Sequence, residues 1–412
     1  MNLLYNISIF LYSILINLSA PFNIKARQIS KGRAQVFAGI AAKINHDRPI
    51  IWIHCASLGE FEQGRPVIEA IRKTHPEYRI FLTFFSPSGY EIRKNYDLAD
   101  YIFYLPADTK KNAVKLISLV RPELVFFVKY EFWFHYLNEL KKKNIPVYLF
   151  SSIFRENQLF FKNSPWGKWY REMLGCVSHF FVQDEKSVEL LNQIGIQQVS
   201  RAGDTRFDRV AEIALHGKNI PIVEKFKGDS QLVVAGSTWK PDEELLIQYI
   251  NSHPETKFII APHETKRSNV ERLINLLKTS VICYTEVTEE SDMNKQVLIV
   301  DTIGLLSSIY KYADIAYIGG GFGVGIHNTL EAAIFGIPII FGPNYLKFQE
   351  ATSMVNLGIA FPVADYELFQ TTMTNLLTNT QKRNSISNEC ITFTKQNIGA
   401  TQKIIDKVFN NS

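Results

Sequence analysis

The sequence predicts an α/β protein with two Rossmann-like domains, a cleft between them and a hydrophobic helix at the N-terminus. Three observations lead to this prediction. Short apolar runs rich in β-formers alternate with amphipathic runs of helical length. The alternation stops across a more polar stretch, residues 208–230, and then resumes. The chain has 412 residues, which exceeds the size that a single hydrophobic core usually supports.

The predicted strands are almost continuously apolar, as in parallel sheets covered by helices on both faces. In the first half they cover residues 50–57, 79–86, 124–129, 147–152 and 179–183. In the second half they cover residues 231–237, 257–262, 297–300, 314–321 and 338–342. We therefore expect one domain over residues 25–210 and another over residues 211–412, with the last helix able to pack back on the first domain. Ligands of such sheets bind beyond the carboxyl ends of the strands.

Residues 1–24 contain an uncharged apolar run, residues 3–20, that is just long enough for a helix to cross a bilayer. The basic residues that follow it are Lys25, Arg27, Lys31 and Arg33. The positive-inside rule then places the rest of the chain in the cytoplasm. Polar residues on one face of the helix also permit an orientation in the plane of the membrane interface. That stripe consists of Asn2, Asn6, Ser13 and Asn17. A hydrophobic helix packed on the protein is the remaining alternative.

Composition limits the class of ligand. The formal net charge of +5 is small for this length and does not indicate a nucleic-acid partner, whereas an anionic membrane or a phosphorylated substrate suits it. The four cysteines are scattered without a C-x-x-C pair, so neither a disulfide framework nor a zinc site is expected. No D-x-D triplet occurs, so we expect no metal ion held against a sugar diphosphate. No cofactor is expected.

Three motifs of the first half carry charged candidates. Glu60 ends the string H-C-A-S-L-G-E at a strand-to-helix junction, where it can act as a general base or merely complement the helix dipole. Glu131 lies among aromatic residues in Y-E-F-W, after a strongly apolar strand. Arg206, in G-D-T-R-F-D, can stabilise phosphate or carboxylate charge on a donor, or form an ion pair that closes the domains.

The second half contains the glycine-rich string G-G-G-F-G-V-G-I-H-N-T-L-E over residues 319–331. Its glycines can let the backbone approach a ligand, and the helix that follows offers free N–H groups to a phosphate. Asn328 and Glu331 have the spacing of a capping box. The turns at residues 261–267 and 301–305 follow two further strands. Three strand ends on one side favour a nucleotide site, although the spacing fits neither a dinucleotide fingerprint nor a P-loop.

Taken in order, these strings resemble the motifs of bacterial 3-deoxy-D-manno-octulosonic acid (Kdo) transferases. The strings are H-C-A-S-L-G-E, S-P-S-G, Y-E-F-W, G-D-T-R-F-D, A-G-S-T-W, D-T-I-G-L-L, the glycine-rich block and G-P-N-Y-L-K-F. The resemblance implies a GT-B fold and an inverting, metal-independent transfer of Kdo. The donor would be CMP-Kdo and the acceptor the 6′-hydroxyl of a lipid A precursor, at the cytoplasmic face of the inner membrane.

The resemblance also implies residue roles. Glu60 matches the general base, Glu131 matches a carboxylate linked to transition-state stabilisation, and Arg206 stands where the family usually has lysine. The positions that match segments contacting CMP are Pro262, His263, Ile303, Gly304, Leu305, Asn328, Thr329, Leu330 and Glu331. The chain departs from the family at three positions: His263 replaces an arginine, Leu305 a glutamate, and Lys129 the first glutamate of E-x-E.

Two other readings stay open at this point. Another GT-B protein, such as a lipid-linked N-acetylglucosamine transferase or a sugar-nucleotide epimerase, would bind a uridine diphosphate donor and would not need the H-N-x-L-E block. A membrane-tethered nucleotide-binding regulator would need Glu60 only as a helix carboxylate.

Overall fold

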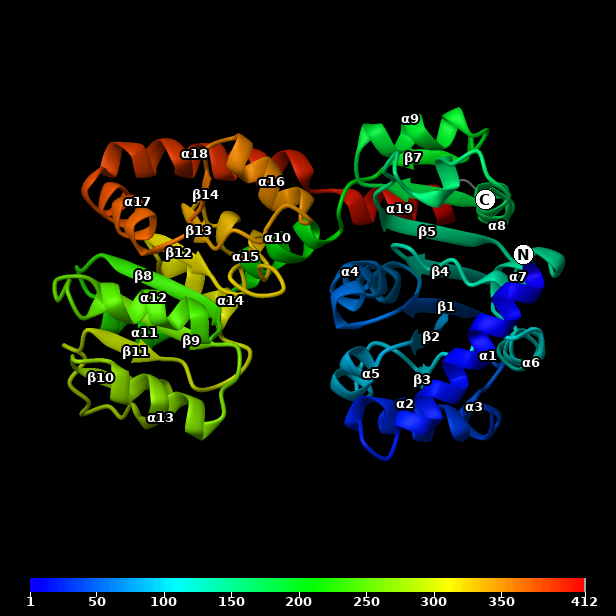
Figure 1. Cartoon of the computed structure of the whole chain (residues 1–412), viewed down its shortest axis with the longest axis horizontal. Helices are drawn as coiled ribbons and strands as arrows, with labels where there is room; N and C mark the ends of the chain where they lie inside the picture. Colours follow the sequence, from blue (N-terminus) through cyan, green and yellow to red (C-terminus); the bar gives the residue numbers. More distant parts are fainter. Residues whose placement is uncertain (411–412) are drawn as a thin grey trace. The chain divides into compact units, whose positions relative to one another are not determined.

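The computed structural model describes residues 1–410 and divides into two compact units (Figure 1). Unit 1 consists of Met1–Arg209 and the C-terminal segment from Ile398, and unit 2 consists of Val210–Asn397. Each unit contains one seven-stranded sheet in which every neighbouring pair of strands is parallel. The prediction of two Rossmann-like units is confirmed.

Unit 1 is built around the strands β1 (Ile50–Cys55), β2 (Arg79–Phe84), β3 (Tyr101–Tyr104), β4 (Leu124–Val128), β5 (Val147–Ser152), β6 (His179–Val182) and β7 (Val199–Arg201). They pair in the order β3-β2-β1-β4-β5-β6-β7. The helices are α1 (Asn2–Ser19), α2 (Ile24–Ala34), α3 (Val36–Lys43), α4 (Leu58–Thr74), α5 (Pro87–Arg93), α6 (Lys110–Val120), α7 (Phe134–Lys142), η1 (Leu159–Phe161), α8 (Pro165–Leu174), α9 (Glu185–Gln193) and α19 (Ala400–Phe409). Helix α10 (Arg206–His216) carries the chain from unit 1 into unit 2.

The apolar runs of unit 1 fill both faces of its sheet. Along β1, Trp52 packs in one buried cluster while Ile51 and Ile53 pack in another, as expected when successive side chains point to opposite faces. Helix α19 joins the second cluster through Ile404 and Val408, and it packs along α4. Because both faces are covered, the strand sequences lack an alternating polar stripe.

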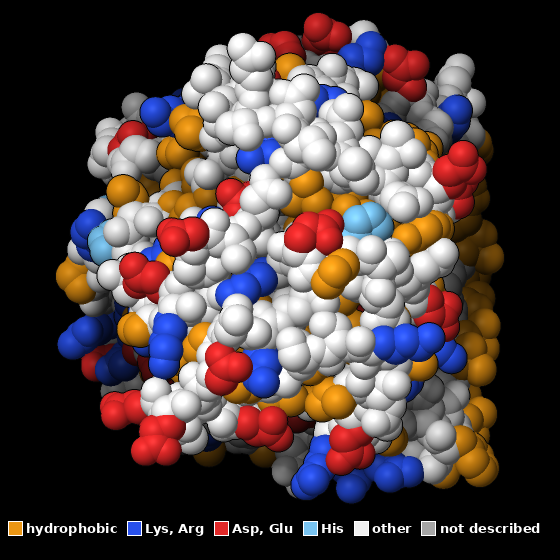
Figure 2. All heavy atoms as spheres, turned by 90° about the vertical axis from the view of Figure 1, so that its left-hand side faces the viewer, with side chains coloured by type: hydrophobic (Ala, Val, Ile, Leu, Met, Phe, Trp, Pro, Cys, Tyr) orange, Lys and Arg blue, Asp and Glu red, His pale blue; other side chains and the backbone are white. Residues whose placement is uncertain are grey.

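Unit 2 is built around β8 (Leu232–Thr238), β9 (Lys257–Pro262), β10 (Val281–Cys283), β11 (Val297–Ile299), β12 (Ile315–Ile318), β13 (Ile339–Phe341) and β14 (Ala360–Pro362), in the order β10-β11-β9-β8-β12-β13-β14. Its helices are α11 (Pro221–Lys227), α12 (Lys240–Ile250), α13 (Arg267–Leu276), η2 (Tyr284–Glu286), α14 (Leu306–Ile309), η3 (Tyr310–Tyr312), α15 (Leu330–Ala333), α16 (Gln349–Asn356), α17 (Tyr366–Thr378) and α18 (Thr380–Asn397). Figure 2 shows that acidic and basic side chains are interspersed over the face of this unit.

The sequence predicted every interior strand of both sheets and missed the four edge strands. These are β3 and β7 in unit 1 and β10 and β14 in unit 2, each only three or four residues long. An edge strand pairs on one side only and needs no long buried run, so it leaves a weak apolar signal.

Helix α1 turns its polar stripe toward unit 1. The Asn2 Oδ1 atom accepts a hydrogen bond from Trp169 Nε1 at 2.7 Å, and the Asn6 Oδ1 atom bonds to His135 Nε2 at 2.6 Å. The Asn17 Oδ1 atom accepts a bond from the α2 residue Ser30 at 2.8 Å. Eight large apolar side chains of α1 are exposed: Leu3, Leu4, Ile7, Phe10, Leu11, Ile14, Leu15 and Leu18. By length and composition α1 is also the one helix of the described residues that could cross a membrane.

Candidate functional site

The order in which strands are added to the sheet of unit 1 reverses between β1 and β4. From β1 the chain adds β2 and β3 on one side, and it then adds β4 to β7 on the other side. The carboxyl ends of two such strands leave a crevice where ligands of doubly wound sheets bind. Glu60 lies in the helix after β1, and Glu131 lies in the loop after β4. The topology therefore brings the two predicted carboxylates to the same edge of the sheet.

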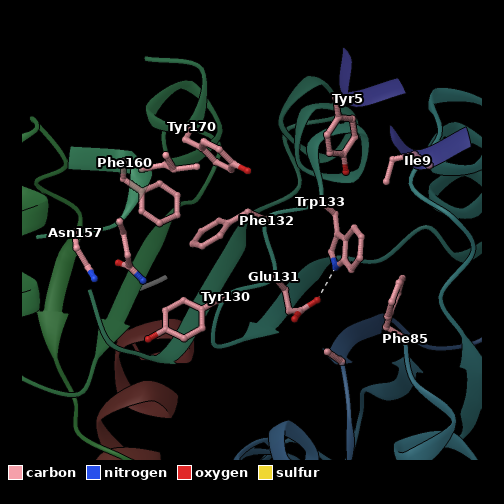
Figure 3. Close-up of a pocket in the computed structure, with 13 residues that line it drawn as sticks. Tyr5, Ile9, Phe85, Tyr130, Glu131, Phe132, Trp133, Asn157, Phe160 and Tyr170 are labelled. Atoms are coloured by element: carbon pink, nitrogen blue, oxygen red, sulfur yellow. Dashed lines mark hydrogen bonds between the residues drawn. The ribbon is translucent and has the colours of Figure 1, made fainter. Parts of the chain in front are cut away.

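Two ring nitrogens hold the Glu131 carboxylate. Glu131 is only 9% exposed, and its Oε2 atom lies 2.6 Å from Trp133 Nε1 (Figure 3). The same oxygen lies 3.1 Å from His54 Nε2. Just before it, Lys129 has a φ of 65°, a left-handed conformation that costs a non-glycine residue about 1–2 kcal/mol. At Lys129 the chain turns sharply out of β4, and this turn directs Glu131 toward His54 of β1. The identity of residue 129 is thus tied to backbone shape as well as to charge.

His54 is fully buried and was not among the residues predicted for the site. The Thr83 hydroxyl accepts a bond from Trp52 Nε1 at 2.8 Å, so its own hydrogen is free to point at His54 Nδ1, also 2.8 Å away. His54 then carries its proton on Nε2 and donates it to Glu131. The Thr83 carbonyl lies 3.1 Å from the same Nδ1 atom. Glu131 is therefore held by a buried histidine whose ring is oriented by Thr83.

A cavity of about 690 Å³ opens beside Glu131. Figure 3 shows aromatic rings around it, contributed by α1, the loop after β4, η1 and α8. Its lining includes Tyr5, Ile9, Ala56, Phe85, Tyr130, Glu131, Phe132, Trp133, Phe160 and Tyr170. Ala56 belongs to the same motif as Glu60. The cavity is thus apolar over most of its wall, with a carboxylate at one side, which suits an amphipathic ligand.

Glu60 stands in the first turn of α4. It is partly exposed, and the hydroxyl of Ser57, the residue that caps the helix, donates a hydrogen bond to its carboxylate. The positive end of a 17-residue helix stabilises the negative charge at this position. The carboxylate is therefore oriented and remains accessible to a ligand.

Arg206 forms an ion pair with Asp204, a partner within unit 1 that the sequence did not predict. Its Nη2 atom lies 2.6 Å from Asp204 Oδ2, and Asp204 is 5% exposed. Burial opposes ionisation of Asp204, but the Arg206 guanidinium and several hydrogen bonds outweigh it and lower the pKa of this carboxyl. Asp204 also accepts a bond from Gln63 of α4 at 3.1 Å, one turn after Glu60. The three residues predicted to be catalytic, Glu60, Glu131 and Arg206, thus all follow the carboxyl ends of strands in the sheet of unit 1.

Unit 2 gathers three rings at the carboxyl ends of β8, β9 and β12. The Trp239 and His263 rings stack with centroids 4.4 Å apart, and the His263 and His327 rings with centroids 4.6 Å apart. Trp239 Nε1 donates to His327 Nε2 at 3.0 Å, which requires that nitrogen to be unprotonated. Burial, and then the neighbouring His263, lower the pKa of His327 to about 4. The predicted turn at Pro262–His263 thus contributes one ring to a stack of three. The other two rings, Trp239 and His327, were not predicted as site residues.

The glycine-rich segment differs from the prediction in its physical role. A Cβ atom on Gly319 would lie 2.3 Å from the Ser237 carbonyl, and one on Gly321 would lie 2.5 Å from the Gly342 nitrogen. A Cβ atom on Gly320 would lie 2.5 Å from the Gly325 carbonyl. These three glycines are required because backbone packs on backbone there, a role that the sequence did not predict.

The helix after this segment is a single turn. Helix α15 has four residues, Leu330–Ala333, and Thr329 is its N-cap residue. Asn328 Oδ1 accepts from the Leu330 N–H at 3.2 Å, and Asn328 Nδ2 donates to Glu331 Oε1 at 3.0 Å. Thr329 is fully buried with no hydrogen-bond partner for its hydroxyl. A single turn has little macrodipole, so a phosphate here would depend on individual N–H groups.

The third predicted nucleotide segment lies after β11, beside β9. Ile303 is 87% exposed, Gly304 has a φ of 93°, and Leu305 caps the four-residue helix α14. Within residues 1–410, no group of three or more His, Cys, Asp or Glu side chains is placed to hold a metal ion. The four cysteines are buried and unpaired.

Comparison with known proteins extends these observations. Residues 31–209 match the family model described as 3-deoxy-D-manno-octulosonic-acid transferase (kdotransferase). A 3-deoxy-D-manno-octulosonic acid transferase of Haemophilus influenzae is 24% identical over 371 residues, which cover 86% of each chain. One from Rickettsia typhi is 26% identical over 394 residues, covering 91% of this chain and 81% of the relative.

Among solved structures, a UDP-GlcNAc 2-epimerase of Neisseria meningitidis aligns with a TM-score of 0.60 at 17% identity, over 88% of this chain and all of that one. A putative UDP-N-acetylglucosamine 2-epimerase of Listeria monocytogenes aligns with a TM-score of 0.60 at 12% identity, over 89% of this chain and 98% of that one. At such identities the likeness concerns the fold alone.

The two Rossmann-like units give the chain a GT-B fold, and the Kdo transferases among its relatives identify it as a glycosyltransferase. Residues 31–209 carry the Kdo transferase domain, and relatives that cover most of the chain confirm the resemblance drawn from the motifs. An enzyme of this family is not a non-catalytic regulator, so that alternative is set aside.

Proposed function

We propose that this protein transfers Kdo from CMP-Kdo to the 6′-hydroxyl of a lipid A precursor, with inversion at the anomeric carbon, in lipopolysaccharide biosynthesis. One observation carries the proposal: Glu60 and Glu131 follow the two strands at the strand-order reversal of unit 1, and Glu131 lines a cavity with a mostly apolar wall. Such a cavity suits an acceptor with a sugar head and lipid chains. The names of the relatives support Kdo as the transferred sugar.

In this proposal Glu60 removes the proton of the acceptor hydroxyl while its oxygen attacks the anomeric carbon from the face opposite CMP. The carboxylate of Kdo balances the oxocarbenium-like charge. CMP departs as its phosphate gains charge, and Arg206 stabilises that charge. Because a phosphate is a good leaving group, no strong general acid is required.

Glu131 has a supporting role in this proposal. Its carboxylate is fixed by His54 and Trp133, so little reorganisation is needed when positive charge develops nearby. The Thr83 hydroxyl bonds to Nδ1 of His54, and the ring therefore presents its Nε2–H group to Glu131.

Unit 2 is the proposed CMP-Kdo domain. The stacked rings of Trp239, His263 and His327 offer a face for a pyrimidine base, and the Asn328–Glu331 segment offers polar groups for the rest of the nucleotide. His263 is a flat ring where the family has arginine, so stacking would replace a cationic contact.

We also propose that α1 attaches the protein to the cytoplasmic face of the inner membrane by lying in the interface. Three of its asparagines bond to side chains of unit 1, and eight of its large apolar side chains are exposed. A helix that spanned the bilayer would have to give up these bonds and remove Tyr5 and Ile9 from the cavity wall.

Donor choice tests this proposal against an epimerase or a transferase that uses a uridine nucleotide. The purified protein is incubated with a lipid A precursor and either CMP-Kdo or UDP-N-acetylglucosamine, and the released or rearranged nucleotide is measured. We expect release of CMP that depends on the acceptor, and no reaction of the uridine nucleotide. Turnover of UDP-N-acetylglucosamine without CMP release would refute the proposal.

A further inference from the structure

Unit 1 contains a second cavity, of about 440 Å³, between α1, α2 and the start of α6. Its polar lining comes from Ser13 and Asn17 of α1, Ser30 and Arg33 of α2, and Asn112 of α6. Arg33 is the only charged side chain in this lining. No role has been given to this cavity above, and it is separate from the cavity that contains Glu131.

Arg33 lacks an anionic partner. Its Nε atom donates to the Leu105 carbonyl at 3.0 Å, and its guanidinium carbon lies 4.5 Å from the centre of the Phe85 ring. Its Nη2 atom is buried without a hydrogen-bond partner, and no carboxylate of residues 1–410 forms an ion pair with it. Burial lowers the pKa of Arg33. Since buried charges in proteins are usually paired, a cation at a cavity wall indicates an anion that binds there.

The geometry points to a site for a phosphate monoester carried by a lipid. A guanidinium presents several N–H groups in a plane that matches phosphate oxygens. Asn112 brings the first turn of α6 to the wall, and an eleven-residue helix adds positive potential at its start. The Ser30 hydroxyl donates to Asn17 Oδ1, which leaves the Asn17 amide N–H groups as further donors. No acidic residue lines the cavity to repel an anion.

The position of the cavity indicates that the phosphate belongs to a lipid. One wall is α1, whose other side is apolar and exposed. Phe85, which packs under the Arg33 guanidinium, also lines the larger cavity beside Glu131. The phosphate can therefore belong to the acceptor of the transfer reaction or to an anionic lipid of the membrane. Only the first source rests on the proposed function.

The test compares the wild type with Arg33→Gln, with Lys31→Gln as the control. Lys31 lies on the same helix, is exposed, and loses the same formal charge when it is changed. In one arm, the intact chain is floated with phosphatidylcholine vesicles that contain phosphatidic acid, a monoester, or phosphatidylglycerol, a diester. In the other arm, KM is measured for a lipid A precursor with and without its phosphate groups. Thermal unfolding of each variant confirms that it is folded.

We expect Arg33→Gln to remove a preference of roughly 10- to 100-fold for the monoester in one of the two arms, since hydrogen bonds to charged groups have that weight. Loss in the vesicle arm identifies a membrane lipid, and a raised KM for the phosphorylated acceptor alone identifies the acceptor. Lys31→Gln should retain the preference in both arms.

Equal preferences in wild type and Arg33→Gln in both arms would overturn the inference. If Arg33→Gln does not fold, Arg33→Lys takes its place. Lysine keeps the charge but not the planar fork, so a several-fold weaker monoester preference is expected, and an unchanged preference counts against the site. The vesicle arm needs no catalysis, so a failure of the proposed Kdo transfer would not be mistaken for a failure of this inference.

Discussion

Glu60 and its neighbour Glu62 differ in surroundings although they share the first turns of α4. The Glu60 carboxylate is oriented by the Ser57 hydroxyl, whereas Glu62 pairs with Arg93 at 3.0 Å. We expect Glu60→Gln to lower kcat by about 100- to 10,000-fold without changing thermal unfolding, because an amide cannot accept the acceptor proton. CMP release measures the effect. Glu62→Gln is the matched control and should keep its turnover; unchanged turnover in Glu60→Gln would end the assignment of the base.

Arg206 combines a proposed contact to phosphate with an observed ion pair to Asp204. Arg206→Lys should keep substantial activity, because the charge is retained. Arg206→Ala should lower kcat by much more than it raises KM for CMP-Kdo, at a cost of roughly 2.7–4 kcal/mol in the transition state. It should also lower the melting temperature, because it leaves Asp204 buried and unpaired.

A double variant separates these two effects. In Asp204→Asn/Arg206→Ala the stranded charge is gone, so stability should recover while kcat stays low. Steady-state kinetics and thermal unfolding on all three variants decide the matter. If the double variant regains both stability and activity, Arg206 has a structural role only.

At the same scale, sequence motifs identified residues but not their contacts. Glu131 was recognised in a local string, and Trp133 lies two residues away. His54, in contrast, contributes from another strand, 77 positions away, and its motif drew attention only for Glu60. A lone histidine in the otherwise apolar run I-I-W-I-H-C was the available signal. The Asp204 ion pair was missed because a spacing of two residues has no regular geometry outside a strand or helix.

At the scale of elements, the ring stack over β8, β9 and β12 predicts a response to acid. The pKa of His327 is about 4 in the folded state, below the ordinary value near 6.5, so the folded state binds fewer protons than the unfolded state. The stability that this histidine confers is complete above pH 6.5 and is lost as the pH falls toward 4. The loss is at most about 1.4 kcal/mol per pH unit, and solvent screening of this partly exposed ring reduces it.

Thermal unfolding of the intact chain across this pH range measures the effect. His327→Gln should flatten the decline, because glutamine does not titrate. Superimposable pH profiles for wild type and variant would contradict a neutral, buried His327.

The strands and helices also show which parts of the fold the sequence pattern can predict. Interior strands such as β1 and β4 were predicted because burial on both faces demands continuous apolar residues. Edge strands such as β10 and β14 were missed because only one of their three residues is buried, so burial does not demand a long apolar run there. The capping-box spacing of Asn328 and Glu331 marks where a helix begins but not where it ends. The single turn of α15 could therefore not be predicted from it.

At the scale of the whole molecule, metal independence is a prediction from the missing D-x-D triplet. We expect transfer to continue in EDTA at the rate measured without it, because helix termini and basic side chains can balance the phosphate charge. The control is a chelator saturated with magnesium before addition. Activity that is lost in EDTA and restored by magnesium would contradict the prediction.

Analysis of the lipid product is the most direct test of the proposed transfer of Kdo from CMP-Kdo onto a lipid A precursor. The intact protein is incubated with CMP-Kdo and the precursor, and the extracted lipid is analysed by mass spectrometry and by the linkage of the added sugar. We expect a lipid product that is heavier by one or more Kdo residues, joined at the 6′ position with inverted anomeric configuration. The Glu60→Gln variant should not form this product. An unmodified lipid, despite an intact CMP-Kdo pool and a folded protein, would contradict it.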